Sequence, residues 1–345
     1  MAIHTETSSE SFSSTTRDSI QEFESATNAG IQEFLTLIEN RFESDAGANS
    51  EMFAYHNAEH TKNVIRRVEK ILSSLDTSPR EIALGKLFAT AHDTIQTGWI
   101  NPRSGKGKLA SGEFTSIFQR YSGSNEQTSF EELSQWMLDY NTKNGNQIFS
   151  DVDIALAKEA ITGTIPGFDD EKTLIQPEIQ QGVSEITLAL ALADLGAFGM
   201  EGPDALLNDG DANFREEFFA ISKTLRDPEM RQSLTENQKK DIQTKMVEWS
   251  QFQIAIANGF KVTFEKDRLP LLNEDKQTKL KEIFPYFQDE AFNTSLQQLE
   301  NKIHLREMMS FEEIVSEMYP DLKIQLIQEQ QQDRAQSIRS TISED

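Results

Sequence analysis

The sequence predicts an all-α protein. Glu, Gln, Leu, Ala and Lys are plentiful, and these residue types favour helices. The 345 residues include only nine prolines, and no segment shows the apolar-polar alternation that is typical of a half-buried strand. With 37% hydrophobic and 26% charged residues, the chain has the composition of an ordinary globular protein and is long enough to bury a substantial core.

The individual helices follow from apolar periodicity and from helix-start signals. Apolar residues recur at helical spacing from Arg17 to about Phe42 and again over residues 57–75. Pro79 suits the first turn of a third helix, which ends at the pair His92-Asp93. Residues 98–113 contain four glycines and are expected to form a loop. Later helices are predicted over residues 128–142, 151–163, 183–197, 213–225, 236–258, 274–286, 288–308 and 310–318.

The chain divides into four predicted parts. Residues 1–16 are rich in Ser and Thr and lack apolar periodicity, so we expect them to be disordered. Residues 17–205 are predicted to form one helical core, which holds the candidate site residues described below. Residues 206–323 should form a C-terminal helical extension packed on that core, because no Pro/Gly/Ser-rich linker separates the two. Residues 324–345 are polar and Gln-rich, and they are expected to be a last helix that frays into a tail.

Charge and cysteine content narrow the classes of partner. The formal net charge of −24 opposes tight binding to duplex nucleic acid, but a small phosphorylated ligand is compatible with a pocket that carries its own cations. The absence of cysteine excludes disulfides and thiolate metal ligands, and it fits a reducing, cytoplasmic location. No targeting segment is visible. The most apolar stretch, residues 185–200, is shorter than the roughly 18 residues of a membrane helix, so no membrane association is expected.

Three of the five histidines lie close together in the sequence, and they suggest a metal site. His56 and His60 are four residues apart, a spacing that would place them on one helical face. His92-Asp93 ends one strongly apolar helix, and Asp194 lies in another. A buried carboxylate is costly unless it is paired or bound to a metal. A shared divalent cation satisfies both carboxylates, and a mixed imidazole and carboxylate set favours Zn, Mn, Fe, Ni or Mg over Ca.

These residues carry a family resemblance. The order His60, His92-Asp93 and Asp194 resembles the H…HD…D signature of the HD-domain superfamily of metal-dependent phosphohydrolases. The segment YHNAEH, residues 55–60, is similar to the YHNxxH motif of cyclic-nucleotide phosphodiesterases. The resemblance covers roughly residues 45–205 and implies an HD-type helical bundle in which His60, His92, Asp93 and Asp194 bind a catalytic metal. It also implies that His56 is the general acid.

The resemblance is not complete. Between Asp93 and Asp194 the chain has no histidine, which disfavours a His-rich dinuclear centre. A second Mg²⁺ that shares Asp93, as in cyclic-nucleotide phosphodiesterases, remains compatible with the pattern.

Phosphoester hydrolysis gives each of these groups a role. A divalent metal lowers the pKa of a water nucleophile and neutralises phosphoryl charge, and an imidazole can protonate the leaving oxygen. We assign catalytic roles to His56 and Asp93, with Asp194 as an alternative partner for the water. Arg103, Lys106 and Lys108 in the Gly-rich loop are either a phosphate clamp or part of a solvated loop.

Glu126 is also assigned to substrate binding, as an outer base, and its alternative role is a charge at a helix N-terminus.

The predicted function is a metal-dependent phosphohydrolase, either a phosphodiesterase or a phosphomonoesterase, for a small, phosphorylated, nucleotide-like substrate. The alternative is a non-catalytic helical module that binds metal or nucleotide and serves regulation. His56 favours the enzyme, because a purely structural metal site would not need it.

Overall fold

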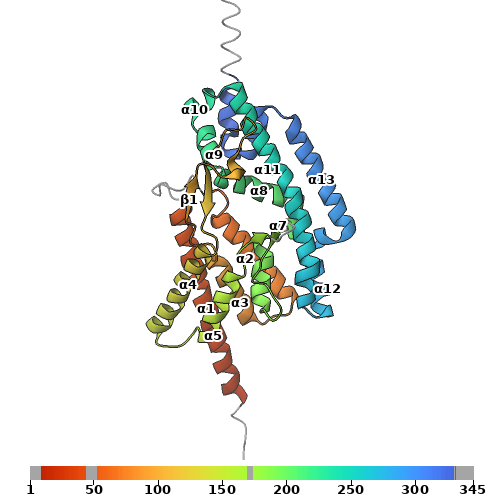
Figure 1. Ribbon diagram of the computed structural model, residues 1–345. Helices are drawn as coiled ribbons and strands as arrows, with labels where there is room; N and C mark the ends of the chain where they lie inside the picture. Colours follow the sequence, from red (N-terminus) through yellow and green to blue (C-terminus); the bar gives the residue numbers. More distant parts are fainter. Residues whose placement is uncertain (1–8, 44–52, 169–173, 330, 332–345) are drawn as a thin grey trace, which may run out of the picture.

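A computed structural model describes residues 9–43, 53–168, 174–329 and 331, and it confirms the all-α fold class (Figure 1). The helices of the N-terminal half are α1 (Ser9–Ile38), α2 (Ala58–Ser74), α3 (Pro79–Ala91), α4 (Ser124–Asn144), α5 (Asp151–Thr162) and α6 (Glu185–Asp194). Helix α3 packs against α1, α2 and α6, while α6 also contacts α2 and α5. Helices α3 and α6 are therefore enclosed by their neighbours.

The C-terminal helices are α7 (Ala197–Glu201), α8 (Pro203–Glu217), α9 (Phe219–Arg226), α10 (Pro228–Gln232), α11 (Glu236–Thr263), α12 (Glu274–Ile283), α13 (Asp289–Met308) and α14 (Phe311–Met318). Figure 1 shows α11 running along the molecule from the group of α9 and α10 to α12. Helix α11 packs against α8, α13 and α14, and α12 returns to contact α2. The C-terminal helices thus pack on the N-terminal bundle.

Short segments connect these helices. They are η1 (Glu39–Glu43) and η3 (Phe264–Arg268), which are π-helical turns, and the 3₁₀ turns η2 (Gly105–Gly107), η4 (Leu269–Leu271), η5 (Pro285–Phe287) and η6 (Pro320–Leu322). Within the described ranges, no helix is both long enough and apolar enough to cross a membrane.

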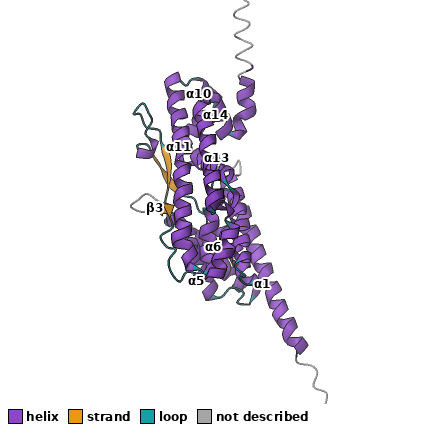
Figure 2. Cartoon of the chain, turned by 90° about the vertical axis from the view of Figure 1, so that its right-hand side faces the viewer, coloured by secondary structure: helices purple, strands orange, loops and turns teal. Residues whose placement is uncertain are grey.

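Two antiparallel hairpins lie at one side of the helices (Figure 2). They pair β1 (Gly98–Asn101) with β2 (Ile117–Arg120), and β3 (Gly167–Phe168) with β4 (Leu174–Ile175). The first hairpin lies partly in the segment predicted as a loop, so that prediction was wrong for residues 98–101. Gly98 pairs with Arg120, and a Cβ on Gly98 would lie 2.3 Å from the carbonyl oxygen of Gln119, so the close approach of the strands requires glycine there.

The described residues are helical at both ends of the chain. Helix α1 begins at Ser9, so residues 9–16 are helical and the disorder predicted for 1–16 does not hold for them. Extending a helix costs less than starting one, because each added residue also adds a hydrogen bond. Residues 1–8 lie outside the described residues. At the other end residues 323–329 are helical, and of the remaining tail the structure describes only residue 331.

Two apolar clusters form the core of the described chain. The main cluster joins the two halves, because it contains side chains of α2, α3 and α6 together with Phe260, Leu280 and Leu299 from the C-terminal helices. The second cluster lies around α8, α9, α11 and α14, and it includes Ile117 of strand β2. The hairpin is therefore anchored in the second cluster.

A buried ion pair also ties α13 to α8. Arg306 donates from Nη1 and Nη2 to the two carboxylate oxygens of Asp211 at 2.7 and 2.6 Å, and Nη1 also donates to Ser250 Oγ at 2.8 Å. Both charged side chains are almost fully buried. The same two helices are joined at the surface by the ion pair between Lys302 and Asp204, whose side chains are 44% and 68% exposed.

These two pairs give a matched test of stability. We expect Arg306→Met to lower the free energy of unfolding by about 3–5 kcal/mol, because it leaves the carboxylate of Asp211 buried without its partner. Lys302→Met removes a charge between the same helices, but the pair is exposed and should cost only about 0–1 kcal/mol. Urea denaturation followed by circular dichroism measures both. Equal losses in the two variants would contradict the role assigned to the buried pair.

Candidate metal centre

His60 is positioned by the start of α2. Asn57 is the N-cap of this helix, and its side-chain oxygen accepts hydrogen bonds from the backbone N–H groups of Glu59 and His60 at 3.0 Å. His60 is thus the third helical residue. His56 precedes the cap, so the expectation that both histidines lie on one helical face was wrong. The chain turns at Asn57 and brings the His56 side chain to the site from outside the helix.

His92 and Asp93 follow directly from the buried end of α3. This helix starts with Ser78 as N-cap and Pro79 in its first turn, as predicted. His92 is its C-cap and is 1% exposed. The Nδ1–H group of His92 donates to the carbonyl oxygen of Ala89 at 2.7 Å, which leaves Nε2 as the atom that can bind a ligand.

Asp194 is the last residue of α6. The helix begins at the N-cap Ser184, whose side chain accepts from the N–H of Thr187, and residues 186–193 are all buried. Asp93 and Asp194 therefore both stand at C-terminal ends of buried helices, where the helix dipole is negative and disfavours an anion. This arrangement of two carboxylates favours a cation between them.

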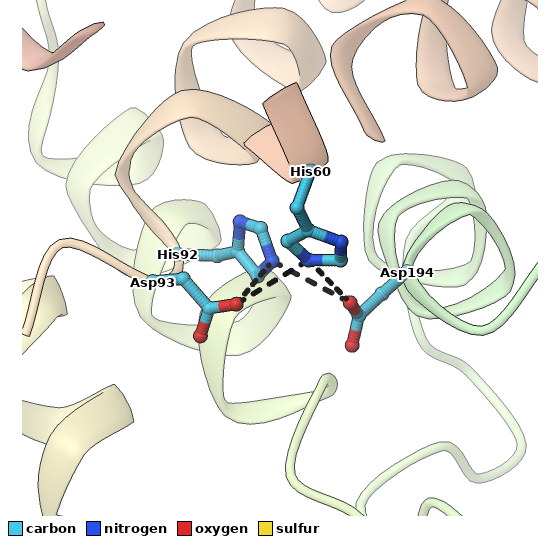
Figure 3. Close-up of side chains that lie close together, drawn as sticks. All are labelled: His60, His92, Asp93 and Asp194. Carbon is cyan, nitrogen blue, oxygen red and sulfur yellow. Dashed lines mark ion pairs between the residues drawn. The ribbon is translucent and has the colours of Figure 1, made fainter. Parts of the chain in front are cut away.

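The four side chains converge on one point, as Figure 3 shows. His60 Nε2 lies 3.5 Å from Asp93 Oδ2 and 3.3 Å from Asp194 Oδ1. His92 Nε2 lies 3.1 and 3.6 Å from the same two oxygens. The four ligand atoms are all within 4.8 Å of one another. The structure thus brings together the four residues that the sequence predicts as metal ligands.

The chemistry of this group fits a divalent cation. The Nε2 atoms of both histidines are buried, and neither makes a hydrogen bond within the described part of the chain, although carboxylate oxygens are near. A metal ion would satisfy these atoms and the two carboxylates together. Two imidazole nitrogens and two carboxylate oxygens suit Zn, Mn, Fe or Ni, with the identity of the ion left open by the ligand set.

The pKa shifts of the four residues also favour a cation between them. Burial lowers the pKa of His60 and His92, but the charges of Asp93 and Asp194 outweigh it and raise both values, that of His92 strongly. Burial alone would raise the pKa of Asp93 and Asp194, yet the neighbouring histidines hold both well below the usual range. Both carboxylates are therefore negatively charged at neutral pH.

His56 lies beside this cluster and is held by a residue that the sequence did not indicate. Its Nδ1–H donates to Glu216 Oε1 at 2.6 Å, and the backbone N–H groups of Tyr55 and His56 donate to Glu216 Oε2 at 3.1 Å. Burial raises the pKa of Glu216, but His56 and then Arg120 lower it below its usual value. The other ring nitrogen of His56, Nε2, lies 3.9 Å from Asp93 Oδ2.

Arg120, the last residue of β2, is the second side chain that sequence reasoning missed. Its Nη1 donates to His56 Nε2 at 2.5 Å, and its Nη2 lies 3.5 Å from Asp93 Oδ1. Asp93 Oδ1 also accepts from Gln96 Nε2 at 2.8 Å. Neither Glu216 nor Arg120 belongs to a local motif, so only their distance in space identifies them.

A cavity of about 350 Å³ adjoins His56. Its walls come from the first hairpin, from the end of α8 and from the turn at Pro166, and its lining includes His56, Ser104, Lys106, Arg120, Asn213 and Glu216. Of the three cations predicted to clamp a phosphate, Lys106 lines this cavity, with Nζ 3.0 Å from Glu217 Oε1. Arg103 and Lys108 are exposed and do not line it.

Glu126 has the second of the two roles considered for it, a charge at a helix N-terminus. It lies in the first turn of α4, and its Oε2 accepts the N–H of Gly123, as expected for a charge at a helix N-terminus. It is also buried, and its Oε1 lies 3.7 Å from Arg120 Nη2. Its contact with the site therefore runs through Arg120.

No protein-family model, curated protein or solved structure matches this chain. The assignment of the site therefore rests on the residues themselves.

The metal centre can be tested without a substrate. Metal-free protein is mixed with Mn²⁺ or Zn²⁺ at a free ion concentration of about 100 times the dissociation constant of that ion. The ion should then raise the free energy of unfolding by about 2.7 kcal/mol, because it binds the folded state. His60→Ala and Asp194→Ala should abolish the rise in melting temperature. His304→Ala is the matched control, because His304 is exposed on α13 and pairs only with Glu307 at 3.0 Å among the described residues. An undiminished rise in the His60 variant would contradict the site.

Proposed function

We propose that this protein is a metal-dependent phosphohydrolase that acts on a small, phosphorylated, nucleotide-like substrate. The observation that carries the proposal is the pairing of a buried His/Asp group with a separate histidine, His56, which is held at its edge by Glu216. A site that only bound metal would need the first group and not the second. The cavity next to His56 offers room for a small substrate.

In this proposal His60, His92, Asp93 and Asp194 hold the ion. A divalent cation bound there supplies a water of lowered pKa and positive charge that stabilises the phosphoryl oxygens. Asp93 is the proposed partner of that water through Oδ2, the oxygen that faces the two histidines, because Gln96 fixes the other oxygen at 2.8 Å and so holds the carboxylate in one orientation. Asp194 lacks a comparable contact to a side chain outside the group among the described residues.

His56 is the proposed proton donor to the leaving oxygen. Its Nδ1–H is engaged by Glu216, so proton transfer to a substrate must use Nε2. That nitrogen lies on the side of Asp93, 3.9 Å from Oδ2, and His56 lines the cavity. Glu216 is a positioning residue, because it acts through His56 and not on the substrate.

The competing function is a regulatory module that binds metal or nucleotide without turnover. A panel of nucleotides and cyclic nucleotides, together with aryl phosphomonoesters and phosphodiesters, assayed with Mn²⁺, Mg²⁺, Ni²⁺ and Co²⁺, separates the two. Hydrolysis that depends on added metal and is lost in Asp194→Ala supports the enzyme. Stoichiometric metal without turnover on the whole panel would support the binding module.

The role of His56 can be separated from that of the ligands. His56→Ala should keep its metal and slow hydrolysis by about 10²–10⁴-fold, because it removes the proton for the leaving group. The loss should shrink for p-nitrophenyl esters, whose leaving oxygen needs little protonation. Elemental analysis and steady-state kinetics measure both properties. Loss of metal from His56→Ala would show instead that His56 is a ligand.

Glu216 should act only through His56. We expect Glu216→Gln to keep its metal and to lower kcat, again less for p-nitrophenyl esters, because the carboxylate that orients the ring is gone. In the double variant with His56→Ala the two losses should not add, since they remove one function. Asp204→Asn is the control, because Asp204 lies on the same helix α8 but is exposed and does not line the cavity. Additive losses in the double variant would rule out the positioning role.

A further inference from the structure

Arg120 reaches the metal centre from an anchored strand. Strand β2 begins with Ile117 and Phe118, which are 2% and 7% exposed. Ile117 belongs to the second apolar cluster, and Phe118 belongs to a small cluster with Phe53. The strand thus has a fixed base in the apolar interior. The Arg120 side chain at its end is 24% exposed and lines the cavity. A rigid strand therefore presents a guanidinium group at the wall of the candidate substrate cavity.

The guanidinium is surrounded by groups that hold it in place. Nη2 lies 3.5 Å from Asp93 Oδ1 and 3.7 Å from Glu126 Oε1, and Nη1 donates to His56 Nε2 at 2.5 Å. Its Nε is buried and has no hydrogen-bond partner in the described residues. The buried Glu126 caps the start of α4 through one oxygen, and its other oxygen places a second negative charge beside Arg120.

The two oxygens of Asp93 are used differently. Oδ2 faces the two histidines at 3.5 and 3.1 Å, on the side of the candidate ion. Oδ1 is already taken by Gln96 Nε2 at 2.8 Å and by Arg120 Nη2 at 3.5 Å. The Oδ1 side of Asp93, where a second cation could share this carboxylate, is occupied by a positive side chain.

We propose that Arg120 is the second cation of this centre: it binds the phosphoryl group of the substrate and takes the place of a second metal ion, so that the chain holds one ion. The inference rests on the proposed function and names the phosphate contact of that same site. A planar guanidinium can bind two oxygens of a phosphate at once, which suits this role.

The contact between Arg120 and His56 gives the proposal a further consequence. In the free protein Arg120 Nη1 donates a hydrogen bond to Nε2 of His56, which is the nitrogen that must face the leaving oxygen. A bound phosphate attracts the guanidinium more strongly than a neutral imidazole does, because charge-assisted hydrogen bonds are about twice as strong as neutral ones. Phosphate binding therefore frees His56 Nε2, which can then take up a proton and donate it to the leaving oxygen.

The test uses the full chain, Mn²⁺ and inorganic phosphate as the probe. Equilibrium dialysis with elemental analysis should find one Mn²⁺ per chain in the wild type and in Arg120→Gln. Calorimetric titration of the Mn²⁺-loaded protein should show phosphate binding that weakens about tenfold or more in Arg120→Gln. Arg120→Lys should recover part of the affinity, since it keeps the charge but not the planar fork.

Arg103→Gln is the matched control, because it removes the same charge from the same hairpin at an exposed position outside the cavity. Its phosphate affinity should stay within about twofold of the wild type, since exposed charges beyond contact distance are screened. Circular dichroism checks that each variant is folded, and if Arg120→Gln does not fold, the comparison rests on Arg120→Lys, which should still weaken binding relative to the wild type.

The inference would be overturned by two Mn²⁺ per chain in the wild type, by phosphate affinity that is unchanged in the Arg120 variants, or by no phosphate binding to the Mn²⁺-loaded wild type. An equal loss in Arg103→Gln would also overturn it, since the effect would then be one of overall charge. None of these measurements requires turnover. Phosphate binding through Arg120 without hydrolysis of any ester would sink the proposed function alone, whereas hydrolysis that is insensitive to Arg120 would sink this inference alone.

Discussion

Two carboxylates at the negative ends of two buried helices are the constraint around which this structure is organised. Asp93 follows α3 and Asp194 ends α6, and both helices are enclosed by apolar neighbours. Removing such a charge from water costs several kcal/mol per ion unless partners are supplied. His60 and His92 supply part of that compensation, and a cation would supply the rest. The large apolar cluster around α3 and α6 keeps these helix ends close together despite the repulsion between their carboxylates.

The two sides of the centre are supported by different parts of the core. The candidate ligands stand on α2, α3 and α6, whose buried faces belong to the main cluster. The wall of the cavity comes from β2 and α8, which contribute Ile117 and Phe214 to the second cluster. His56 lies where the two sides meet, since its ring is bonded to Glu216 of α8 and its chain leads directly into α2. Residues that line the cavity and residues that form the candidate metal group therefore rest on different apolar clusters.

The sequence predicted the parts of the site that depend on local pattern. His92, Asp93 and Asp194 could be identified because they lie at the ends of apolar helices, and His60 because it stands in an ordered pattern with them. Pro79 marked one helix start. The helical position of His56 was wrong, because a periodic pattern does not show that Asn57 caps the helix. Glu216 and Arg120 were missed because Glu216 is 160 residues from its partner His56, and Arg120 is 64. The first hairpin was missed because its strands have only four residues each. The single helix predicted over residues 213–225 is in fact divided at Phe218 into α8 and α9.

Helix α11 has a consequence for how the protein unfolds. With 28 residues it spans about 42 Å, and it places Ile242 and Met246 in one apolar cluster but Ala257 and Phe260 in the other. Because α11 contributes to both clusters, the loss of either cluster would remove packing from part of this helix. The shared helix therefore couples the stability of the two clusters, and a substitution that weakens one should also raise amide hydrogen exchange in the part of α11 that lies in the other.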